Sequence, residues 1–269
     1  MTRILVLAGL LAAILVVVLV GLRVPAAPFP EPPRTQAPDT VPVPRDLPAP
    51  VARFYRGLYG DAIPVTRNVV LTGRARLRIL GVSMPARWRF THDVGHGYRH
   101  EIVATWFGLP LFVVDERYLD GVAEMRLPFG IVETGATVDQ GANLALWAEA
   151  MWFPAALATD PRVRWEVVDD ATAMLHVPHG GDSETFIARF DPTTTRLTVL
   201  EAMRYKGADA TSKTLWLTRA EAWGDVDGHP TMTTASVQWL DEAQPWATFR
   251  VDHLRFGVDD LDARLGRTP

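Results

Sequence analysis

One carboxylate stands out because of the apolar residues around it. Glu149 is the only charged residue between Asp139 and Asp160, and Trp147 and Trp152 lie beside it in the sequence. Without a charged partner, a carboxylate in such surroundings has a raised pKa. It would then serve as a general acid, or it would bind the polar head group of a ligand in a cavity. The alternatives are an ion pair with an arginine of a strand and a position facing solvent.

Two histidines flank a glycine-rich turn. His92 and His100 lie on either side of Gly95-His96-Gly97, which is typical of a hairpin loop. A three-residue loop pairs Val94 with Tyr98 and sets His92 opposite His100. Two facing imidazoles could bind a metal ion or respond to pH, but the sequence shows no clear third ligand. The pattern favours a polar hairpin tip, and we expect neither a metal site nor a cofactor.

The chain contains nine tryptophans, a large number for 269 residues. They could line a cavity for an apolar ligand, or they could fill the core of a curved sheet. Both interpretations stay open at this point. The candidate ligand-binding residues are Trp88, Trp106, Trp147, Glu149, Met151, Trp152 and Trp165.

The composition excludes several classes of site. The formal net charge is −4 and there is no basic stripe suited to a phosphate backbone, so we expect no nucleic-acid partner. The absence of cysteine excludes disulfides, thiolate catalysis and an N-terminal lipid-modified cysteine. A glycine-rich phosphate loop and a nucleophile elbow are also missing from the sequence.

The first residues form an apolar segment long enough to cross a bilayer. Residues 4–22 contain no charged side chain, and a helix of this length reaches roughly 28 Å. A cleaved secretory signal is the alternative, but its apolar core is shorter and Pro25 disfavours a cleavage site nearby. We therefore expect a single-pass membrane anchor over residues 1–24. The short N-terminal tail and the large C-terminal domain favour an extracytoplasmic domain.

The composition then changes twice along the chain. Ten prolines lie between Pro25 and Pro50, so residues 25–46 are predicted to form an extended linker, either a stiff stalk or a disordered segment. Residues 47–260 are predicted to form a single domain that begins with a short amphipathic helix, and residues 261–269 form a tail.

Alternating polar and apolar residues indicate about eleven consecutive strands with short turns, which is typical of an antiparallel sheet. Asp120-Gly121 predicts a two-residue hairpin that pairs Leu119 with Val122. The same register forms the opposite-charge pairs Arg117–Glu124 and Asp115–Arg126.

One helix interrupts the strands. Residues 139–153 are apolar nearly all round, which indicates a helix that is buried or faces a cavity. Thr137 or Asp139 is expected to cap it, and Pro154 is expected to disturb its end. The predicted fold is α+β but mostly β: a strongly curved antiparallel sheet, an incomplete barrel, wraps around this helix, and a single transmembrane helix precedes it.

Four motifs of the domain are residues 47–55 (LPAPVARFY), 148–157 (AEAMWFPAAL), 163–170 (VRWEVVDD) and Phe190-Asp191. These motifs resemble a bacterial membrane-anchored family of unknown function, and the resemblance covers residues 47–258. The run EAMWFP is the most specific of them. The family has no established activity, so the resemblance implies no catalytic residue.

The order of elements is loosely similar to that of the lipoprotein-sorting carriers and lipid-carrier lipoproteins. Those proteins form an incomplete antiparallel barrel, closed on one side by helices, around an apolar cavity. They carry a lipid-modified cysteine, which this chain lacks. The resemblance implies a binding module for a lipid or other apolar ligand, held at the cell membrane through residues 4–22.

Two other functions stay open. The first is a hydrolase-like enzyme that uses Glu149, with a strand arginine or histidine. The second is an interaction domain with a solid core, which would meet a protein partner through an arginine-rich outer face.

Overall fold

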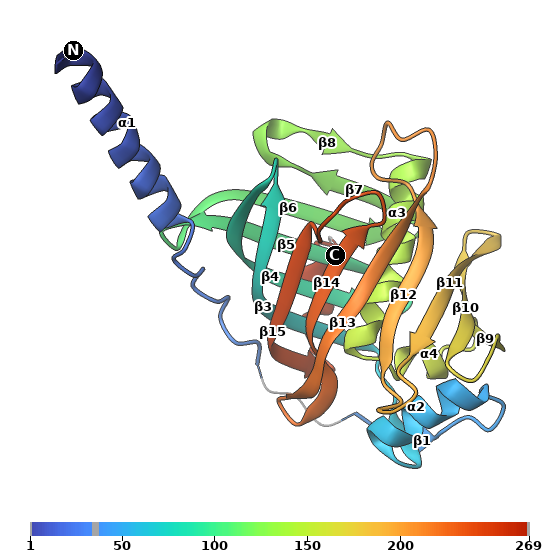
Figure 1. Cartoon of the computed structure of the whole chain (residues 1–269). Coiled ribbons are helices and arrows are strands. Elements are labelled where there is room, and N and C mark those ends of the chain that lie inside the picture. Colours follow the sequence, from blue (N-terminus) through green and yellow to red (C-terminus); the bar gives the residue numbers. More distant parts are fainter. Residues whose placement is uncertain (1, 34–37, 268–269) are drawn as a thin grey trace.

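The computed structural model describes residues 2–33 and 38–267. Its main element is one antiparallel sheet of thirteen strands in the order β8-β7-β6-β5-β4-β3-β15-β14-β13-β12-β11-β10-β9. Two meanders, β3 to β8 and β9 to β15, join where β15 pairs with β3. Because β8 and β9 remain its two edges within the described chain, the sheet is curved but not closed into a barrel (Figure 1).

The strands of this sheet are β3 Asn68–Ile79, β4 Val82–Asp93, β5 Gly97–Trp106, β6 Leu109–Leu119, β7 Val122–Arg126, β8 Val132–Glu133, β9 Arg164–Val167, β10 Thr172–His179, β11 Asp182–Phe190, β12 Leu197–Arg204, β13 Thr214–Val226, β14 His229–Trp239 and β15 Ala247–Phe256. The helices are α1 Thr2–Gly21, α2 Ala49–Tyr59, η1 Pro128–Gly130, α3 Ala136–Ala148, η2 Glu149–Trp152, α4 Ala156–Thr159 and α5 Leu261–Leu265, where η denotes a 3₁₀ helix. Strands β1 Thr40–Pro42 and β2 Ala62–Pro64 form a separate pair.

The predicted fold class is confirmed, but the number of strands is thirteen rather than about eleven. Strand β8 has two residues, which is too short to show alternation. Residues 69–73 of β3 are all buried, so this part of the strand has no polar side and also escapes a period-two search.

Helix α3 is the predicted buried helix, and it runs between the two edges of the sheet. All of its residues from Val138 to Ala148 are buried except Asp139. It ends at Ala148, and the chain continues as η2 instead of reaching Phe153 in an α-helix. Phe153 leaves the helical conformation, as expected for a residue that precedes a proline.

The predicted N-cap of α3 is wrong. Gly135 occupies the cap position and no side chain bonds there. The Thr137 hydroxyl instead donates to the carbonyl of Ala208, and the Asp139 carboxylate accepts a 2.7 Å hydrogen bond from the backbone N–H of Ala123. Both side chains therefore tie the helix to neighbouring segments instead of closing its first turn.

The Asp120-Gly121 hairpin forms with the predicted register. Leu119 pairs with Val122, and the two predicted cross-strand charge pairs are register partners. Their side chains, however, also reach along their own strands: Arg117 lies 3.5 Å from Asp115, and Arg126 lies 2.7 Å from Glu124.

Helix α1 is the one described helix long and apolar enough to cross a membrane, judged by length and composition. It ends against the β5–β6 turn, where the Trp106 indole donates to the carbonyl of Val18 and the Phe107 N–H donates to that of Gly21. The segment that follows contacts the sheet: Phe29 lies under the guanidinium of Arg87 at 4.8 Å.

Helix α2 closes the opposite end of the concave face. Phe54 packs against Phe190 and Trp223, with ring centroids 5.7 and 5.5 Å apart. The Tyr55 hydroxyl donates a buried 2.8 Å hydrogen bond to the carbonyl of Pro154. In Figure 1, α1 leaves the upper end of the sheet and α2 lies at the lower end.

Candidate functional site

A cavity of about 280 Å³ lies between α3, η2 and the concave face of the sheet. Its wall is largely apolar and aromatic, as in small-molecule sites. The aromatic lining residues are Phe90, Trp152, Trp216, Trp239, Trp246 and Phe249. The polar lining residues are His100, Glu116, Glu149, Arg204, Lys206 and Thr218. The cavity therefore combines an apolar wall with a small set of charged groups.

The structure brings only part of the predicted ligand-binding set to this cavity. Trp152 and Glu149 line it, and Trp88 stacks on Trp152 from the core at 5.3 Å. Trp147 and Met151 are buried in the core. The remaining two predicted residues lie elsewhere: Trp106 contacts the end of α1, and Trp165 donates to the carbonyl of Leu157 while packing near Phe190.

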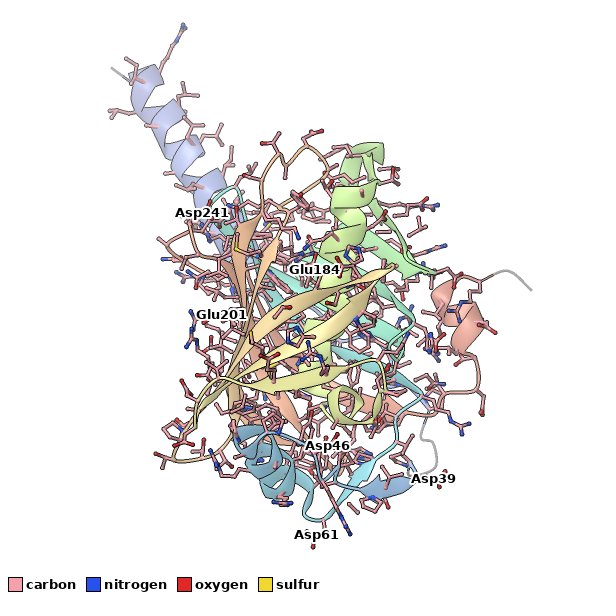
Figure 2. All side chains as sticks on the ribbon, turned by 90° about the vertical axis from the view of Figure 1, so that its right-hand side faces the viewer. Asp39, Asp46, Asp61, Glu184, Glu201 and Asp241 are labelled. Atoms are coloured by element: carbon pink, nitrogen blue, oxygen red, sulfur yellow. The ribbon has the colours of Figure 1, made fainter. Side chains whose placement is uncertain are left out.

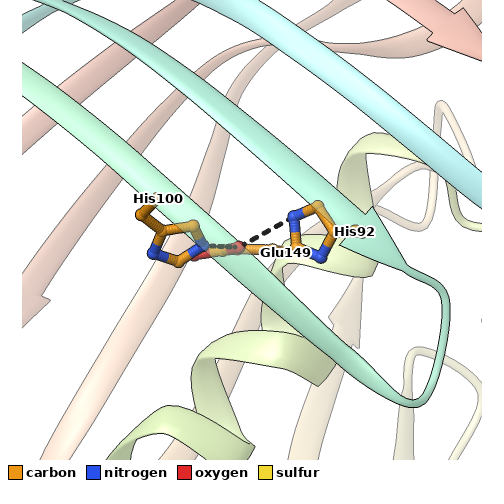
Figure 3. Close-up of side chains that lie close together, drawn as sticks. All are labelled: His92, His100 and Glu149. Carbon is orange, nitrogen blue, oxygen red and sulfur yellow. Dashed lines mark hydrogen bonds and ion pairs between the residues drawn. The ribbon is translucent and has the colours of Figure 1, made fainter. Parts of the chain in front are cut away.

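Glu149 lies at the start of η2 and meets both predicted histidines. One of its oxygens lies 2.8 Å from Nε2 of His100 and 3.1 Å from Nε2 of His92 (Figure 3). The partner of this carboxylate is therefore a pair of imidazoles, neither an arginine nor bulk water. His92 and His100 reach it from β4 and β5.

The predicted pairing of the two histidines is wrong, because the register of β4 and β5 is shifted by two residues from the predicted one. The turn pairs Asp93 with Gly97, so His92 lies opposite Tyr98 and His100 lies opposite Phe90. A shift by two residues keeps side chains on the same face of a strand. Both imidazoles consequently point into the concave side, where they are buried, instead of forming a polar tip.

A second carboxylate supports His100 from the other side. Glu116 of β6 lies 3.6 Å from Nδ1 of His100 and accepts a 2.6 Å hydrogen bond from the Tyr98 hydroxyl. The imidazole of His100 is also held between two rings, with Tyr98 at 3.8 Å and Phe90 at 3.9 Å. Its orientation is thus fixed by contacts on four sides.

The pKa values follow from these contacts. Burial alone would raise the pKa of Glu149, but His100 and His92 outweigh it and lower the pKa to about 2. Burial would lower the pKa of His100, but Glu149 and Glu116 outweigh it and raise the pKa to about 9. Burial lowers the pKa of His92, whose weaker contact with Glu149 only opposes this effect.

With these charges, His100 and Glu149 form an ion pair. Near neutral pH, Glu149 is ionised and His100 is protonated, so neither has a pKa close to the working pH of a general acid or base. His92, His100 and Glu149 also offer three ligand atoms within 4.8 Å of one another, a donor set that suits Zn²⁺. We interpret His100 and Glu149, 2.8 Å apart, as a buried ion pair with the buried His92 beside it.

The family is shown by the sequence. A family model described as a family of unknown function, DUF6544, matches residues 39–251. The chain belongs to DUF6544. A search of curated proteins found no match.

Three solved structures are similar to this DUF6544 chain. A DUF1329 family protein from Desulfovibrio piger is 13% identical, with a TM-score of 0.43 over 75% of this chain and 90% of that one. A Vibrio parahaemolyticus domain, described as an outer membrane lipoprotein-sorting protein, is 12% identical, with a TM-score of 0.43 over 74% and 92%. A LolA superfamily protein from Nitrosomonas europaea is 10% identical, with a TM-score of 0.46 over 73% and 89%.

Most of the cavity wall of this DUF6544 chain was not predicted from the sequence, which singled out only His100, Glu149 and Trp152 of the lining residues. Arg204, Trp216, Trp239 and Trp246 come from the second meander, more than fifty residues after Glu149. One signal was available: Trp216 and Trp239 occupy inward positions of predicted strands, as alternation requires. Glu116 carried no comparable signal, because a lone acidic residue in a strand is usually exposed.

Proposed function

We propose that this protein is a membrane-anchored binding module that holds a lipid or other apolar ligand in the cavity beside Glu149. The observation that carries the proposal is the cavity itself, which is lined by four tryptophans and two phenylalanines. Burial of apolar surface would drive binding, with about 25 cal/mol gained per Å² removed from water. The charged cluster would orient the polar part of the ligand.

The position of the anchor supports this function. Leu77 pairs with both Ala247 and Met84, and Ala86 pairs with Ala104. The strand ends next to Trp246 and Trp106 therefore lie at the same end of the sheet. Trp246 lines the cavity, whereas Trp106 contacts α1. The cavity therefore lies near the end of the domain from which the anchor leaves.

The charged rim of the cavity lies at the same end. Lys206 lines the cavity, is exposed, and pairs with Asp241 at 2.7 Å. In Figure 2, Asp241 lies at the upper end of the domain, the end from which α1 leaves, whereas Asp46 and Asp61 lie at the lower end near α2. A ligand leaving the bilayer would thus meet the open end of the cavity first.

An exposed apolar strip next to the anchor fits contact with a bilayer. Leu109, Leu111 and Val113 lie close together along β6 and are 68, 55 and 49% exposed. Phe107 at the adjacent turn is also exposed. Contiguous apolar surface of this kind marks a membrane or protein contact site. We also propose that the domain lies on the extracytoplasmic side, as the large domain that follows the apolar helix would after export.

The function is tested with the full chain in lipid nanodiscs, by native mass spectrometry and lipid extraction. We expect a ligand-sized adduct that is absent from the Ala145→Leu variant, because Ala145 lines the cavity and leucine would fill it. Ala222→Leu makes the same change at an exposed position and should retain the adduct. A bare chain mass that does not shift when lipids are added would overturn the proposal.

A further inference from the structure

Arg204 is a charged group of the cavity that has no hydrogen-bond or ion-pair partner among the described residues. It is the last residue of β12, and its guanidinium carbon lies 4.5 Å from the ring centroid of Trp216 and 5.7 Å from that of Trp239. Glycine at position 141 of α3 makes room for it, since a Cβ there would lie 3.1 Å from Nε of Arg204. Two aromatic rings and a helix backbone thus hold the guanidinium at the cavity wall.

The donors of this guanidinium are not used. Among the described residues it forms no hydrogen bond and no ion pair within 4.0 Å, and its Nε is buried without an acceptor. Other arginines of the sheet differ: Arg99 pairs with Asp115 at 2.6 Å, and Arg89 pairs with Glu101. A guanidinium has five N–H donors. The Nε donor of Arg204 is buried without an acceptor, whereas the residue as a whole is half-buried and its Nη donors remain open to a ligand.

The nearby carboxylates cannot easily fill this role, because they are engaged elsewhere. Glu116 and Glu149 influence Arg204 electrostatically from a distance, and burial lowers the pKa of Arg204 against their effect. Glu149 is contacted by two imidazoles, and Glu116 by His100 and the Tyr98 hydroxyl. The second cation of the rim, Lys206, is already paired with Asp241.

We propose that Arg204 binds the anionic head group of a single-chain amphiphile, with a carboxylate or phosphate accepting its hydrogen bonds while the apolar chain packs among the tryptophans. This inference rests on the proposed function and names the class of ligand. A planar guanidinium matches such oxyanions with two parallel hydrogen bonds. The unmet donors of Arg204 make the site selective for an anion over a neutral head group of equal chain length.

The test compares four decyl compounds that share one chain: decanoate, decyl phosphate, decanol and decylamine. Occupancy of the full chain in nanodiscs is measured by native mass spectrometry. For each compound, wild type and variant are exposed to the same concentration of free ligand. The ratio of their affinities for that compound is therefore independent of its partition into the bilayer. We expect the two anions to bind wild type about 10- to 100-fold more tightly than decanol, and decylamine to bind weakest.

The key variant is Arg204→Met, which keeps the contact with Trp216 and removes the charge. We expect it to bind all four compounds with similar affinity and to melt at or above the wild-type temperature, since it removes a half-buried cation whose Nε has no acceptor. Arg204→Lys keeps the charge but lacks the planar guanidinium, so it should retain part of the preference for anions over decanol. It also replaces the methionine variant in the test if that variant fails to fold. Arg189→Met, at an exposed pair with Glu201, is the control and should leave the preference unchanged.

The two hypotheses fail in different ways. If none of the four compounds binds wild type and no lipid co-purifies, the proposed binding function is wrong. If all four bind wild type with equal affinity, or if Arg204→Met keeps the preference for anions, the cavity binds apolar chains but the role of Arg204 is wrong. A preference for decanoate over decyl phosphate, or the reverse, identifies the oxyanion.

Discussion

The two ends of the concave face contain the same kinds of residue and use them differently. At the end covered by α2, aromatic side chains such as Phe54 and Phe190 fill the space between helix and sheet. At the end near the anchor, Trp216, Trp239 and Trp246 surround a cavity of about 280 Å³. Alternation of inward residues is the same in both regions, so the difference comes from what covers each end.

The cover explains the contrast. Helix α2 and the turn at Pro154 supply side chains and hydrogen bonds that close the lower end. The upper end has the charged groups of Arg204 and Lys206 instead. Apolar side chains fill a core to high density only where a complementary surface is present. The side chains of the lower end thus form a packed core, whereas those of the upper end line a cavity.

The largest expected effect is at the closed end. Phe54 is 1% exposed, so Phe54→Ala should lower the free energy of unfolding by about 3–5 kcal/mol. Trp246→Ala at the partly exposed cavity wall should cost about 1 kcal/mol despite removing a larger ring. Urea unfolding of the full chain, followed by fluorescence, measures both. Equal losses would mean that the open end is packed as tightly as the closed one.

The next effect tests the buried cluster at the open end. Glu149→Gln leaves His100 without a charged partner at its Nε2, and breaking a buried ion pair costs about 3–5 kcal/mol. We expect a loss near 3 kcal/mol, because Glu116 still supports the ring. Glu201→Gln removes the partner of the exposed Arg189 and should cost below about 1 kcal/mol. A Glu149→Gln variant as stable as wild type would contradict the ion-pair interpretation.

Much of the molecule could be predicted from local patterns, and the rest could not for a physical reason. The buried helix, the Asp120-Gly121 register and the curved sheet all follow from periodicities within one or two elements. The partner of Glu149 is forty-nine residues away, on another element. Whether an arginine or a histidine pairs with Glu149 depends on how the strands tilt against α3. No local pattern carries that information.

The tryptophans show the same limit. Trp88 and Trp152 were both sensible cavity candidates, and they stack on each other. Only Trp152 reaches the cavity, because Trp88 lies one layer deeper, against the sheet. Sequence predicts that a side chain points inward but not whether another side chain lies above it.

A smaller effect is the alkaline dependence of stability at the open end. The pKa of His100 is about 9 in the folded protein and ordinarily 6.5, so its contribution is complete below pH 6.5 and is lost as the pH rises through 9. His92 has a lowered pKa and is neutral over this range. We expect a loss on the order of 2 kcal/mol between pH 6.5 and 10.

The matched variant for this pH dependence is His100→Gln, whose stability should fall much less over the same range. The chain has no cysteine, so no thiol titrates there and complicates the comparison. Thermal unfolding with a chelator present measures both proteins. Parallel pH profiles for wild type and His100→Gln would show that His100 is not protonated in the fold.

Single cysteine substitutions for spin labelling should have the smallest effect on stability. They also test which end of the domain faces the bilayer. Because the chain is free of cysteine, Leu111→Cys and Asp61→Cys each give one labelling position, at the open and closed ends respectively. Both positions are exposed, so stability should stay within about 0.5 kcal/mol of wild type. In nanodiscs, a spin label at position 111 should be reached by oxygen dissolved in the lipid, and one at position 61 by a water-soluble relaxing agent. If both labels respond as water-exposed sites, the apolar strip of β6 does not touch the membrane, and the open end of the cavity receives its ligand from solution instead.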